Sequence, residues 1–523
     1  MIQSQTQTQS YWQNRFELTD ADVEQIYNHL LEVEQPQTAA ELAAVVIAHR
    51  VAQEKQEIKR RLAGRVVYQP ANHYEEGDEL VFPALDFAYG TVVGTRLGTN
   101  PETGQFTVIN VDLDGKMREF AADLGAEHVL NRENGSIFEA LEMIEPEELG
   151  ELYGDLVTER VTAGIEEREA FVRLADRWFL KALLTEVNVG HLNLAEAVLD
   201  MVGGGPLPPD EILPHLELGD DVPVATQSFS LNYALLQDQR FDEVAPRGQV
   251  GWFLRRMEPQ AVREVPGRLE YDPIPYDPKA LTPELQLLER ELDDEWSDIA
   301  PVNTPQPVVL ALIYPHRWAG TLPLSARTSA LFPVGRSPRQ RIEFIDEQTN
   351  EKIVGWLVQE HRYVYGLEEW YRENEIPVGG FISLRPGPEP GVILLDFDRR
   401  RGQREWVRLA SVEEKRIQFA LDRRTISCGY DDLMIVGTDY VAAVDALWRR
   451  AESNDRPVGS LLRELFPELA ELNPQQTVHA KTLYSAINML RRMPPGPVFA
   501  ELVSNPAFVP VGDHYWQFEP ARG

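Results

Sequence analysis

Two stretches of the chain, Phe241-Asp-Glu-Val-Ala-Pro-Arg-Gly-Gln-Val-Gly-Trp252-Phe-Leu254 and Phe508-Val-Pro-Val-Gly-Asp-His-Tyr-Trp516-Gln-Phe518, share one pattern. In both, an apolar strand leads through a turn with glycine into a second strand that carries a tryptophan. Each stretch also follows segments in which apolar residues recur at helical spacing. Helices followed by a hairpin at 190–265 and again at 451–523 predict two copies of one module.

This order of elements is that of a winged helix. The two segments resemble winged helices of the HARE type, which are related to the helical domain of the RNA polymerase delta subunit. The resemblance implies a module that binds nucleic acid or a partner protein, in which the tryptophan of the wing belongs to the core. The residues that carry it are Phe241, Val244, Gly248, Trp252 and Leu254 in the first copy and Phe508, Val511, Gly512, Trp516 and Phe518 in the second.

Composition limits the class of protein. With 523 residues and 43% hydrophobic content, the chain is too long for one core and predicts a multidomain globular protein. Its net charge of −34 should repel nucleic acid at long range unless a local basic patch overrides the mean. The single cysteine, Cys428, excludes an internal disulfide framework and a zinc site of several cysteines.

The ends and apolar runs of the sequence predict a compartment. No apolar run approaches the length of a membrane span, and the polar N-terminus lacks the features of a signal peptide. We therefore expect a cytoplasmic, prokaryotic protein without membrane contact. Residues 1–16 are predicted to be a disordered tail.

The segment 17–64 is predicted to be helical and to resemble a helix-turn-helix unit, although no clean wing follows it. Thr38 and Glu41 have the spacing of a capping box. The next segment, 65–130, changes to short strands punctuated by glycine and predicts a small five-stranded barrel. Gly77-Asp-x-Leu-Val-Phe-Pro83 and Gly90-Thr-Val-Val93 resemble SH3-like barrels of transcription-associated proteins. A plain β-barrel with a scaffold role stays open.

Three further segments are predicted to be acidic or to connect domains. Residues 131–189 form an acidic helical segment, and residues 266–305 an acidic, proline-rich linker with one helix near 282–296. Residues 411–450 form a mixed connector that contains a helix. Over 131–305 there are 14 Lys and Arg against 36 Asp and Glu.

The segment 306–410 returns to strands. Its order of strands, with a short helix after Gly366-Leu367 and a further strand after Gly379-Gly380, resembles the DNA-binding pseudobarrel of plant auxin-response factors. That family has Gly-Trp and Gly-Asp pairs at these two places, so the resemblance extends to a seven-stranded topology but not to orthology. The same barrel also recognises DNA in some restriction enzymes, so the fold alone does not assign a function.

Arginines make this segment the best candidate for a nucleic-acid site. It carries 14 Lys and Arg against 13 Asp and Glu, while the rest of the chain carries all of the excess negative charge. Arginine forks bind two acceptors on guanine or on a phosphate. The alternative is that residues 399–402 are a solvated hairpin turn. The resemblance places Arg327, Arg336, Arg339 and Arg341 on one arm of a clamp on double-stranded DNA, and Arg385, Arg399, Arg400, Arg401 and Arg404 near the other.

We find no catalytic motif, phosphate-binding loop or metal-binding pattern in the sequence. Cys428 has no adjacent base and is predicted to be a buried thiol rather than a nucleophile. The chain is therefore expected to be non-enzymatic, with no catalytic residue, metal or cofactor.

The sequence favours two functions, and an enzyme whose carboxylates are brought together only by folding is the third alternative. The first is a multidomain α+β protein that binds DNA or takes part in transcription, in which the pseudobarrel grips DNA and the winged helices add contacts. The second is an acidic scaffold that binds a basic partner protein, or that imitates the charge of DNA toward a DNA-handling enzyme.

Overall fold

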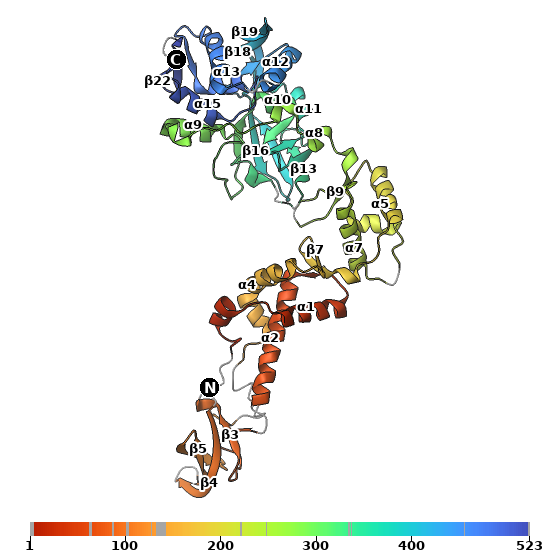
Figure 1. Ribbon diagram of the computed structural model, residues 1–523, viewed down its shortest axis with the longest axis vertical. Coiled ribbons are helices and arrows are strands. Elements are labelled where there is room, and N and C mark those ends of the chain that lie inside the picture. Colours follow the sequence, from red (N-terminus) through yellow and green to blue (C-terminus); the bar gives the residue numbers. More distant parts are fainter. Residues whose placement is uncertain are drawn as a thin grey trace. The chain divides into compact units, whose positions relative to one another are not determined.

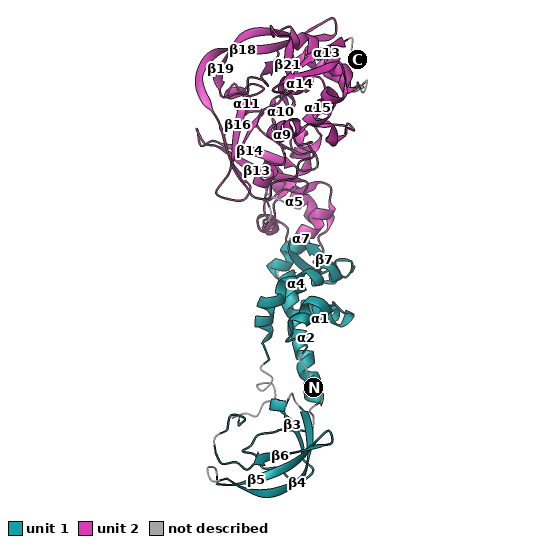
Figure 2. Ribbon diagram, turned by 90° about the vertical axis from the view of Figure 1, so that its left-hand side faces the viewer, with its two compact units in different colours: residues 1–186, 218–230 teal, residues 187–217, 231–523 magenta. Residues whose placement is uncertain are grey.

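The computed structural model describes residues 5–61, 65–85, 88–100, 104–126, 128–131, 143–219, 222–246, 248–332, 335, 337–453 and 456–520. The chain divides into two compact units, residues 1–186 with 218–230 and residues 187–217 with 231–523 (Figure 2). Helices and several separate sheets occur together, so the mixed α+β class expected from the sequence is confirmed.

One order of elements occurs three times along the chain: a helix, a short strand, two helices and a hairpin. In every copy the short strand pairs with the second strand of the hairpin. The first copy is α1 (Asp20–Val33), β1 (Gln37–Thr38), α2 (Ala39–Arg61), α4 (Pro146–Glu166), β7 (Phe171–Leu174) and β8 (Arg177–Leu180). The second is α5 (Val189–Met201), Leu207, α6 (Pro209–Ile212), α7 (Val224–Gln237), β9 (Phe241–Glu243) and β10 (Trp252–Leu254). The third is α13 (Val458–Ala470), β21 (Thr477–His479), α14 (Ala480–Ile487), α15 (Pro495–Ser504), β22 (Phe508–Gly512) and β23 (Tyr515–Phe518).

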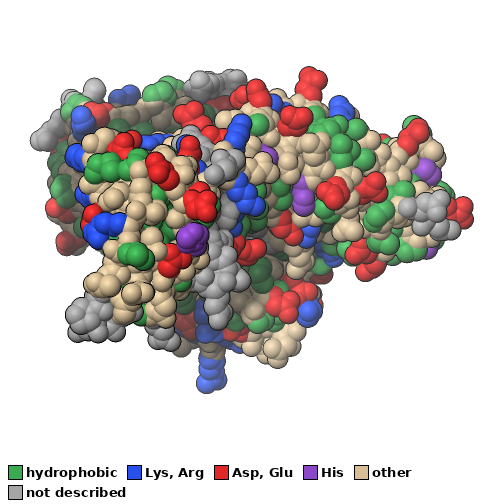
Figure 3. All heavy atoms as spheres, turned by 90° about the horizontal axis from the view of Figure 1, so that it is seen from below, with side chains coloured by type: hydrophobic (Ala, Val, Ile, Leu, Met, Phe, Trp, Pro, Cys, Tyr) green, Lys and Arg blue, Asp and Glu red, His purple; other side chains and the backbone are tan. Residues whose placement is uncertain are grey.

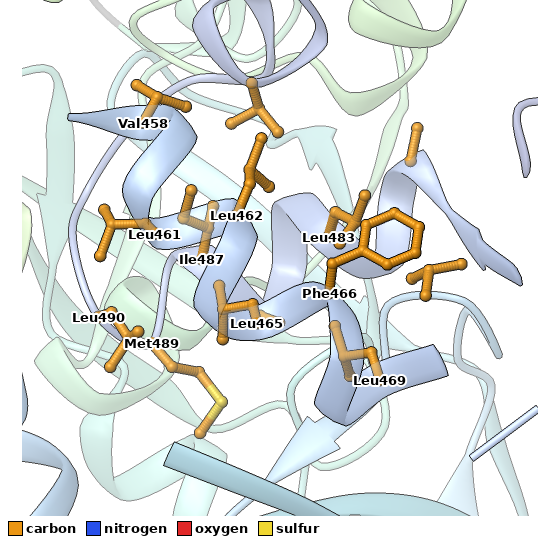
Figure 4. Close-up of a cluster of buried hydrophobic side chains, with 14 of the residues drawn as sticks. Val458, Leu461, Leu462, Leu465, Phe466, Leu469, Leu483, Ile487, Met489 and Leu490 are labelled. Carbon is orange, nitrogen blue, oxygen red and sulfur yellow. The ribbon is translucent and has the colours of Figure 1, made fainter. Parts of the chain in front are cut away.

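The three hairpin tryptophans, Trp178, Trp252 and Trp516, are all buried. The expectation that Trp252 and Trp516 belong to the core is confirmed, and Trp252 Nε1 donates a hydrogen bond of 2.7 Å to Asn232 Oδ1. Figure 4 shows the core of the third copy, where Leu462 and Phe466 of α13 lie beside Ile487 and Leu483 of α14. Burial of this apolar face stabilises the module.

The first copy is interrupted by a five-stranded sheet (Figure 1). The expected segment boundaries at residues 64 and 130 therefore separate α2 from α4, although these two helices pack together. The hairpin missing after residue 64 is β7–β8, which follows the insert. Thr38 and Glu41 form the capping contacts expected at the start of α2, with Thr38 N donating to Glu41 Oε2 over 2.6 Å. The inserted strands are β2 (Val66–Val67), β3 (Glu79–Phe82), β4 (Ala88–Asn100), β5 (Gly104–Leu113) and β6 (Lys116–Ala122), paired in that order.

Residues 5–16 differ from the disordered tail expected over 1–16. They contain a π-helical turn at Tyr11–Arg15, and Trp12 and Phe16 are buried. The Trp12 ring stacks on Tyr153 of α4 with 6.2 Å between the ring centroids. Burial of two large aromatic side chains outweighs the polar composition of the flanking residues.

A seven-stranded, curled half-barrel sheet occupies the middle of the second unit. Its strand order is β11-β16-β17-β13-β14-β15-β12, and only the β13–β17 pair is parallel. The helices α10 (Tyr314–Ala319) and α11 (Glu368–Glu373) contact each other and connect its strands. The strands are β11 (Val308–Ala311), β12 (Thr321–Pro323), β13 (Arg339–Asp346), β14 (Lys352–Val358), β15 (Tyr363–Tyr365), β16 (Phe381–Pro386) and β17 (Val392–Phe397).

A long hairpin follows this sheet. Strands β18 (Arg399–Glu413) and β19 (Arg416–Cys428) pair along their length, and β20 (Val436–Gly437) joins β18 to complete a separate sheet. The turn residues Glu414 and Lys415 both have positive φ, as a two-residue hairpin of type I′ requires. The expected boundary at residue 410 therefore cuts through β18. The helix expected in 411–450 is α12 (Val441–Ser453).

Residues 266–305 are not a free linker. Their helix α9 (Pro283–Leu292) lies within the expected range and buries Leu285 and Leu288 in the core that includes α13 and α14. The residues after it, Asp294 and Glu295, are also buried. The acidic composition suggested solvent exposure. However, a buried arginine compensates these charges, and it comes from the third copy of the repeated module, called the C-terminal module below. The short elements around this segment are α8 (Gln260–Arg263) and the 3-10 turns Arg255–Met257, Gly267–Leu269 and Pro278–Ala280.

Three parts of the second unit meet at this buried charge cluster. Arg492, which follows α14, lies 2.7 Å from Asp294 Oδ1 and 2.6 Å from Glu295 Oε1. His316 of α10 lies 3.2 Å from the same Glu295 oxygen. The cluster thus joins the seven-stranded sheet and the C-terminal module through the segment expected to be a linker.

Candidate nucleic-acid interface

The arginines expected on the first arm of the clamp are held by acceptors within the chain. Arg327 forms an ion pair with Asp293 at 3.0 Å, and Arg339 forms an ion pair with Asp242 at 3.2 Å and lies 3.1 Å from the carboxyl group of Glu258. Arg336 lies outside the described residues. The charges of Arg327 and Arg339 are therefore compensated internally.

Arg341 also turns toward the protein. Its Nη1 donates a hydrogen bond of 2.8 Å to Gly205 O, and its guanidinium lies 6.0 Å from the centre of the Phe253 ring. Burial lowers the pKa of Arg341 because the charged form loses hydration. The side chain thus attaches β13 to the second copy of the repeated module.

The sheet does not bring the two expected arms together. Arg341 lies near the start of β13, whereas Arg399 follows the end of β17, the parallel neighbour of β13. Because Asp346 pairs with Leu395, the two ends are separated by roughly 20 Å or more along the strands. Arg385 lies on β16 and forms an ion pair with Glu347. This ion pair raises the pKa of Arg385.

The remaining expected residues lie at the start of the β18–β19 hairpin. Arg399 donates to Asn374 Oδ1 over 2.9 Å, and Arg400 forms an ion pair with Asp398 at 2.6 Å. Arg401 and Arg404 are exposed. These four arginines are thus grouped on one element. Among the described residues, Arg400 is the only one of the four that forms an ion pair.

The hairpin as a whole is basic. Residues 399–428 contain nine Lys and Arg against four Asp and Glu, in a chain whose net charge is −34. By contrast, acidic and basic side chains are interspersed on the face of the molecule shown in Figure 3. A positive element on a negative protein localises the attraction for a polyanion.

One face of the hairpin combines arginine with an exposed tryptophan. Arg404 and Trp406 are two residues apart on β18 and share a face, and Arg423 is the cross-strand partner of Trp406. Trp406 is 59% exposed, and the Arg423 guanidinium lies 5.5 Å from the centre of its ring. Arg404 and Arg423 each donate to the backbone oxygen of the other, over 3.3 and 3.2 Å. Neither arginine forms an ion pair with a carboxylate of the described residues.

The opposite face is different in charge. Glu405 lies opposite Arg424, and Arg424 forms ion pairs with Asp422 at 3.0 Å and Asp439 at 2.6 Å. Its positive charge is therefore compensated. The hairpin presents uncompensated guanidinium groups on the Trp406 face and paired charges on the other.

A cleft of about 350 Å³ opens at the start of the hairpin, where the β18–β19 register shifts between Arg399 and Gln403. Cys428 is buried as expected, and burial raises its pKa to about 11, so the thiol stays protonated near neutral pH. Burial and the neighbouring carboxylates of Asp432 and Glu405 raise the pKa of Tyr430 to about 12. The cleft thus offers donors but no thiolate. It is lined by Arg400, Arg401, Gln403, Glu405, Ile426, Cys428 and Tyr430.

Sequence reasoning missed Trp406 and Arg423. The alternation Arg404-x-Trp406-x-Arg408 is the signal that could have found the first, since residues two apart share one face of a strand. Arg423 could not be assigned without the register, which depends on the turn at residues 414–415.

Comparisons with protein-family models, with curated proteins and with solved structures found no match. In the part of the chain that the structure describes, no helix combines the length and apolar character needed to cross a membrane. The described residues also contain no cluster of three or more His, Cys, Asp or Glu side chains suited to a metal ion.

Proposed function

We propose that the protein binds DNA, without catalysis, through the β18–β19 hairpin. The observation that carries this proposal is the Trp406 face, where Arg404 and Arg423 have no carboxylate partner among the described residues although the chain is strongly acidic. A basic surface on an otherwise acidic protein localises the attraction for a polyanion. Phosphate oxygens of DNA supply that balance.

A two-stranded ribbon has the right dimensions for this task, because the major groove of double-stranded DNA admits one. Arg401, Arg404 and Arg423 would then contact phosphates or guanine edges from neighbouring positions of one ribbon. The seven-stranded sheet, which we take to be a pseudobarrel of the DNA-binding type, serves as the platform that carries the ribbon. This activity belongs in the cytoplasm, in a transcription-associated or other DNA-handling role.

The three repeated modules support this role indirectly. We propose that they are winged helices and that the five-stranded insert is an SH3-like barrel. Their hairpin tryptophans are buried, and α15 of the third copy is mostly buried and contains no Lys or Arg, so these parts of the modules offer no stacking or basic side chain to nucleic acid. Their task in the proposal is to hold partner proteins and to support the hairpin.

The proposal is tested by removing the uncompensated charges together. We expect Arg401→Ala/Arg404→Ala/Arg423→Ala to weaken binding of a random duplex at low salt, measured by fluorescence anisotropy. The slope of log affinity against log salt should fall by about 0.9 for each phosphate that the variant no longer neutralises. Arg372→Ala is the matched control, since Arg372 is an exposed arginine of the same unit that pairs with Glu369. An unchanged affinity and slope in the triple variant would refute the proposal.

The acidic scaffold remains the second candidate because of α4. This helix exposes a row of carboxylates and carries a single arginine, Arg160, along its length. The exposed acids are Glu147, Glu148, Glu151, Asp155, Glu159 and Glu166. If the protein fails to bind duplex at low salt but binds an oligolysine peptide, and if Glu148→Lys/Glu151→Lys abolishes that binding, the scaffold function replaces DNA binding.

A further inference from the structure

We infer that the hairpin recognises DNA at unpaired bases, with Trp406 stacking on one base and Arg404 and Arg423 holding the adjacent phosphates. This inference rests on the proposed DNA binding and specifies the form of DNA that the same surface prefers. It starts from the exposure of Trp406, which is the most exposed of the ten tryptophans.

Packing does not account for Trp406. Its neighbours on the same face of the hairpin are Arg404 and Arg408 on β18 and, across the strands, Arg423 and Leu421, and Leu421 is itself exposed. A large aromatic ring beside an exposed leucine leaves an apolar surface in water that a ligand would cover. The arginines on either side restrict that ligand to one with both an apolar face and negative charge.

The two arginines are positioned before any ligand arrives. Each donates a side-chain hydrogen bond to the backbone oxygen of the other, and the Arg423 guanidinium lies 5.5 Å from the centre of the Trp406 ring. Each keeps further N–H donors, because a guanidinium carries five. Preorganised charge beside an aromatic ring lowers the entropy cost of binding a nucleotide.

A base can stack on an indole ring only through its face, and not through its edge. In a perfect duplex both faces of every base are covered by neighbouring pairs, and a ribbon in the major groove contacts edges only. Unpaired bases expose a face and stack on aromatic side chains regardless of sequence. Arg423 already lies over the Trp406 ring, so this single indole is suited to one base. The geometry therefore favours single strands, or duplexes with a short unpaired region, over perfect duplex.

The experiment compares three fluorescent probes of equal length with the full-length protein: a perfect duplex, the same duplex with an internal mismatch bubble, and a single strand. We expect the wild type to bind the bubble and the single strand more tightly than the duplex. Trp406→Ala should weaken those two by about tenfold or more, while its duplex affinity changes little. Trp406→Phe should keep part of the preference, because phenylalanine retains a π-face.

Trp318 provides the matched control, because it is 39% exposed and also lies against arginines, with Arg317 5.3 Å from its ring centre. Trp318→Ala should bind all three probes as the wild type does. A second readout is the quenching of tryptophan fluorescence by an unlabelled single strand, which should be lost in Trp406→Phe and kept in Trp318→Phe.

The outcomes separate the two proposals. If the wild type prefers the perfect duplex, or if Trp406→Ala weakens all probes equally, the inference is overturned and DNA binding stands. If the wild type binds none of the probes at low salt, the proposed function itself fails. Because Trp406 and Trp318 are exposed, circular dichroism should show that their variants remain folded.

Discussion

At the scale of single residues, the charged side chains of the buried cluster have ionic partners, whereas two exposed arginines of the hairpin have none within the described part of the chain. Arg492, Asp294 and Glu295 are buried together, whereas Arg404 and Arg423 are exposed without an ionic partner among the described residues. Burial alone would raise the pKa of Glu295, but Arg492 and His316 overcome it and lower the pKa to about 2. A charged side chain can be buried only where an oppositely charged partner lies close to it.

We expect Arg492→Met to destabilise the protein by about 3–5 kcal/mol, because it removes the guanidinium shared by two buried carboxylates. The measurement is the thermal unfolding transition of the second unit at neutral pH. Arg456→Met is the control, since Arg456 pairs with Glu464 near the surface and such a pair contributes only about 0–1 kcal/mol. Equal losses in both variants would contradict the importance of burial.

Glu258 gives a prediction about pH. Burial, followed by the adjacent Asp242, raises the pKa of Glu258 to about 8, so the folded protein retains a proton that the unfolded chain releases near pH 4.3. Between these two values stability should therefore fall as pH rises, and above about pH 8 this dependence should end. Glu258→Gln mimics the protonated form and should flatten the pH dependence of the melting temperature. Glu264→Gln, at an exposed position, should not.

Residue types predicted part of the candidate site. The cluster Arg399 to Arg404 and the buried thiol of Cys428 could be identified from sequence alone. The ion pairs of Arg327 and Arg339 could not, because their acids Asp293, Asp242 and Glu258 are distant in sequence and are brought near by folding.

At the scale of elements, the pattern that predicted two hairpins occurs a third time. Phe171-x-x-Leu174 and Trp178-x-Leu180 repeat the spacing of the hairpins at 241–254 and 508–518. This copy was missed because the five-stranded insert separates it from its first two helices. A local sequence pattern is enough to identify a hairpin. To assign this hairpin to its module, however, the five-stranded insert must first be recognised.

The tryptophan in these hairpins is a structural residue, and its removal should be costly. We expect Trp252→Ala to destabilise the second unit by about 3–5 kcal/mol, since it removes a buried indole and leaves Asn232 without its hydrogen bond. Trp252→Phe should cost less. Thermal unfolding followed by near-ultraviolet circular dichroism measures both, and a neutral Trp252→Ala would contradict a core role.

At the scale of the whole molecule, the chain accommodates a separate sheet within a helical module. The ends of the insert connect to helices that pack together, and Lys55 of α2 lies 3.4 Å from Glu145 just before α4. Chain insertion is tolerated where the two connecting ends are close. The overall class and the strand-rich segments followed from composition and periodicity, whereas this nesting did not.

Replacing residues 65–130 by a short Gly-Ser linker should therefore leave the helical module of the first unit folded. The replaced segment carries four Lys and Arg against eleven Asp and Glu, so the shortened protein is also less negative and should bind DNA somewhat faster at low salt. Far-ultraviolet circular dichroism at the helical band tests the fold. Disappearance of the helical signal would show that the insert is required for the module.

The cluster around Arg492 has a consequence for how the protein is divided in the laboratory. A recombinant fragment that stops before residue 456 keeps Asp294 and Glu295 but lacks the guanidinium that compensates them. Such a truncation should expose a hydrophobic face of α9 and become a substrate for proteases. Productive expression of the seven-stranded sheet thus requires the C-terminal module on the same polypeptide, even though about 180 residues separate the sheet's first strand from Arg492 in sequence.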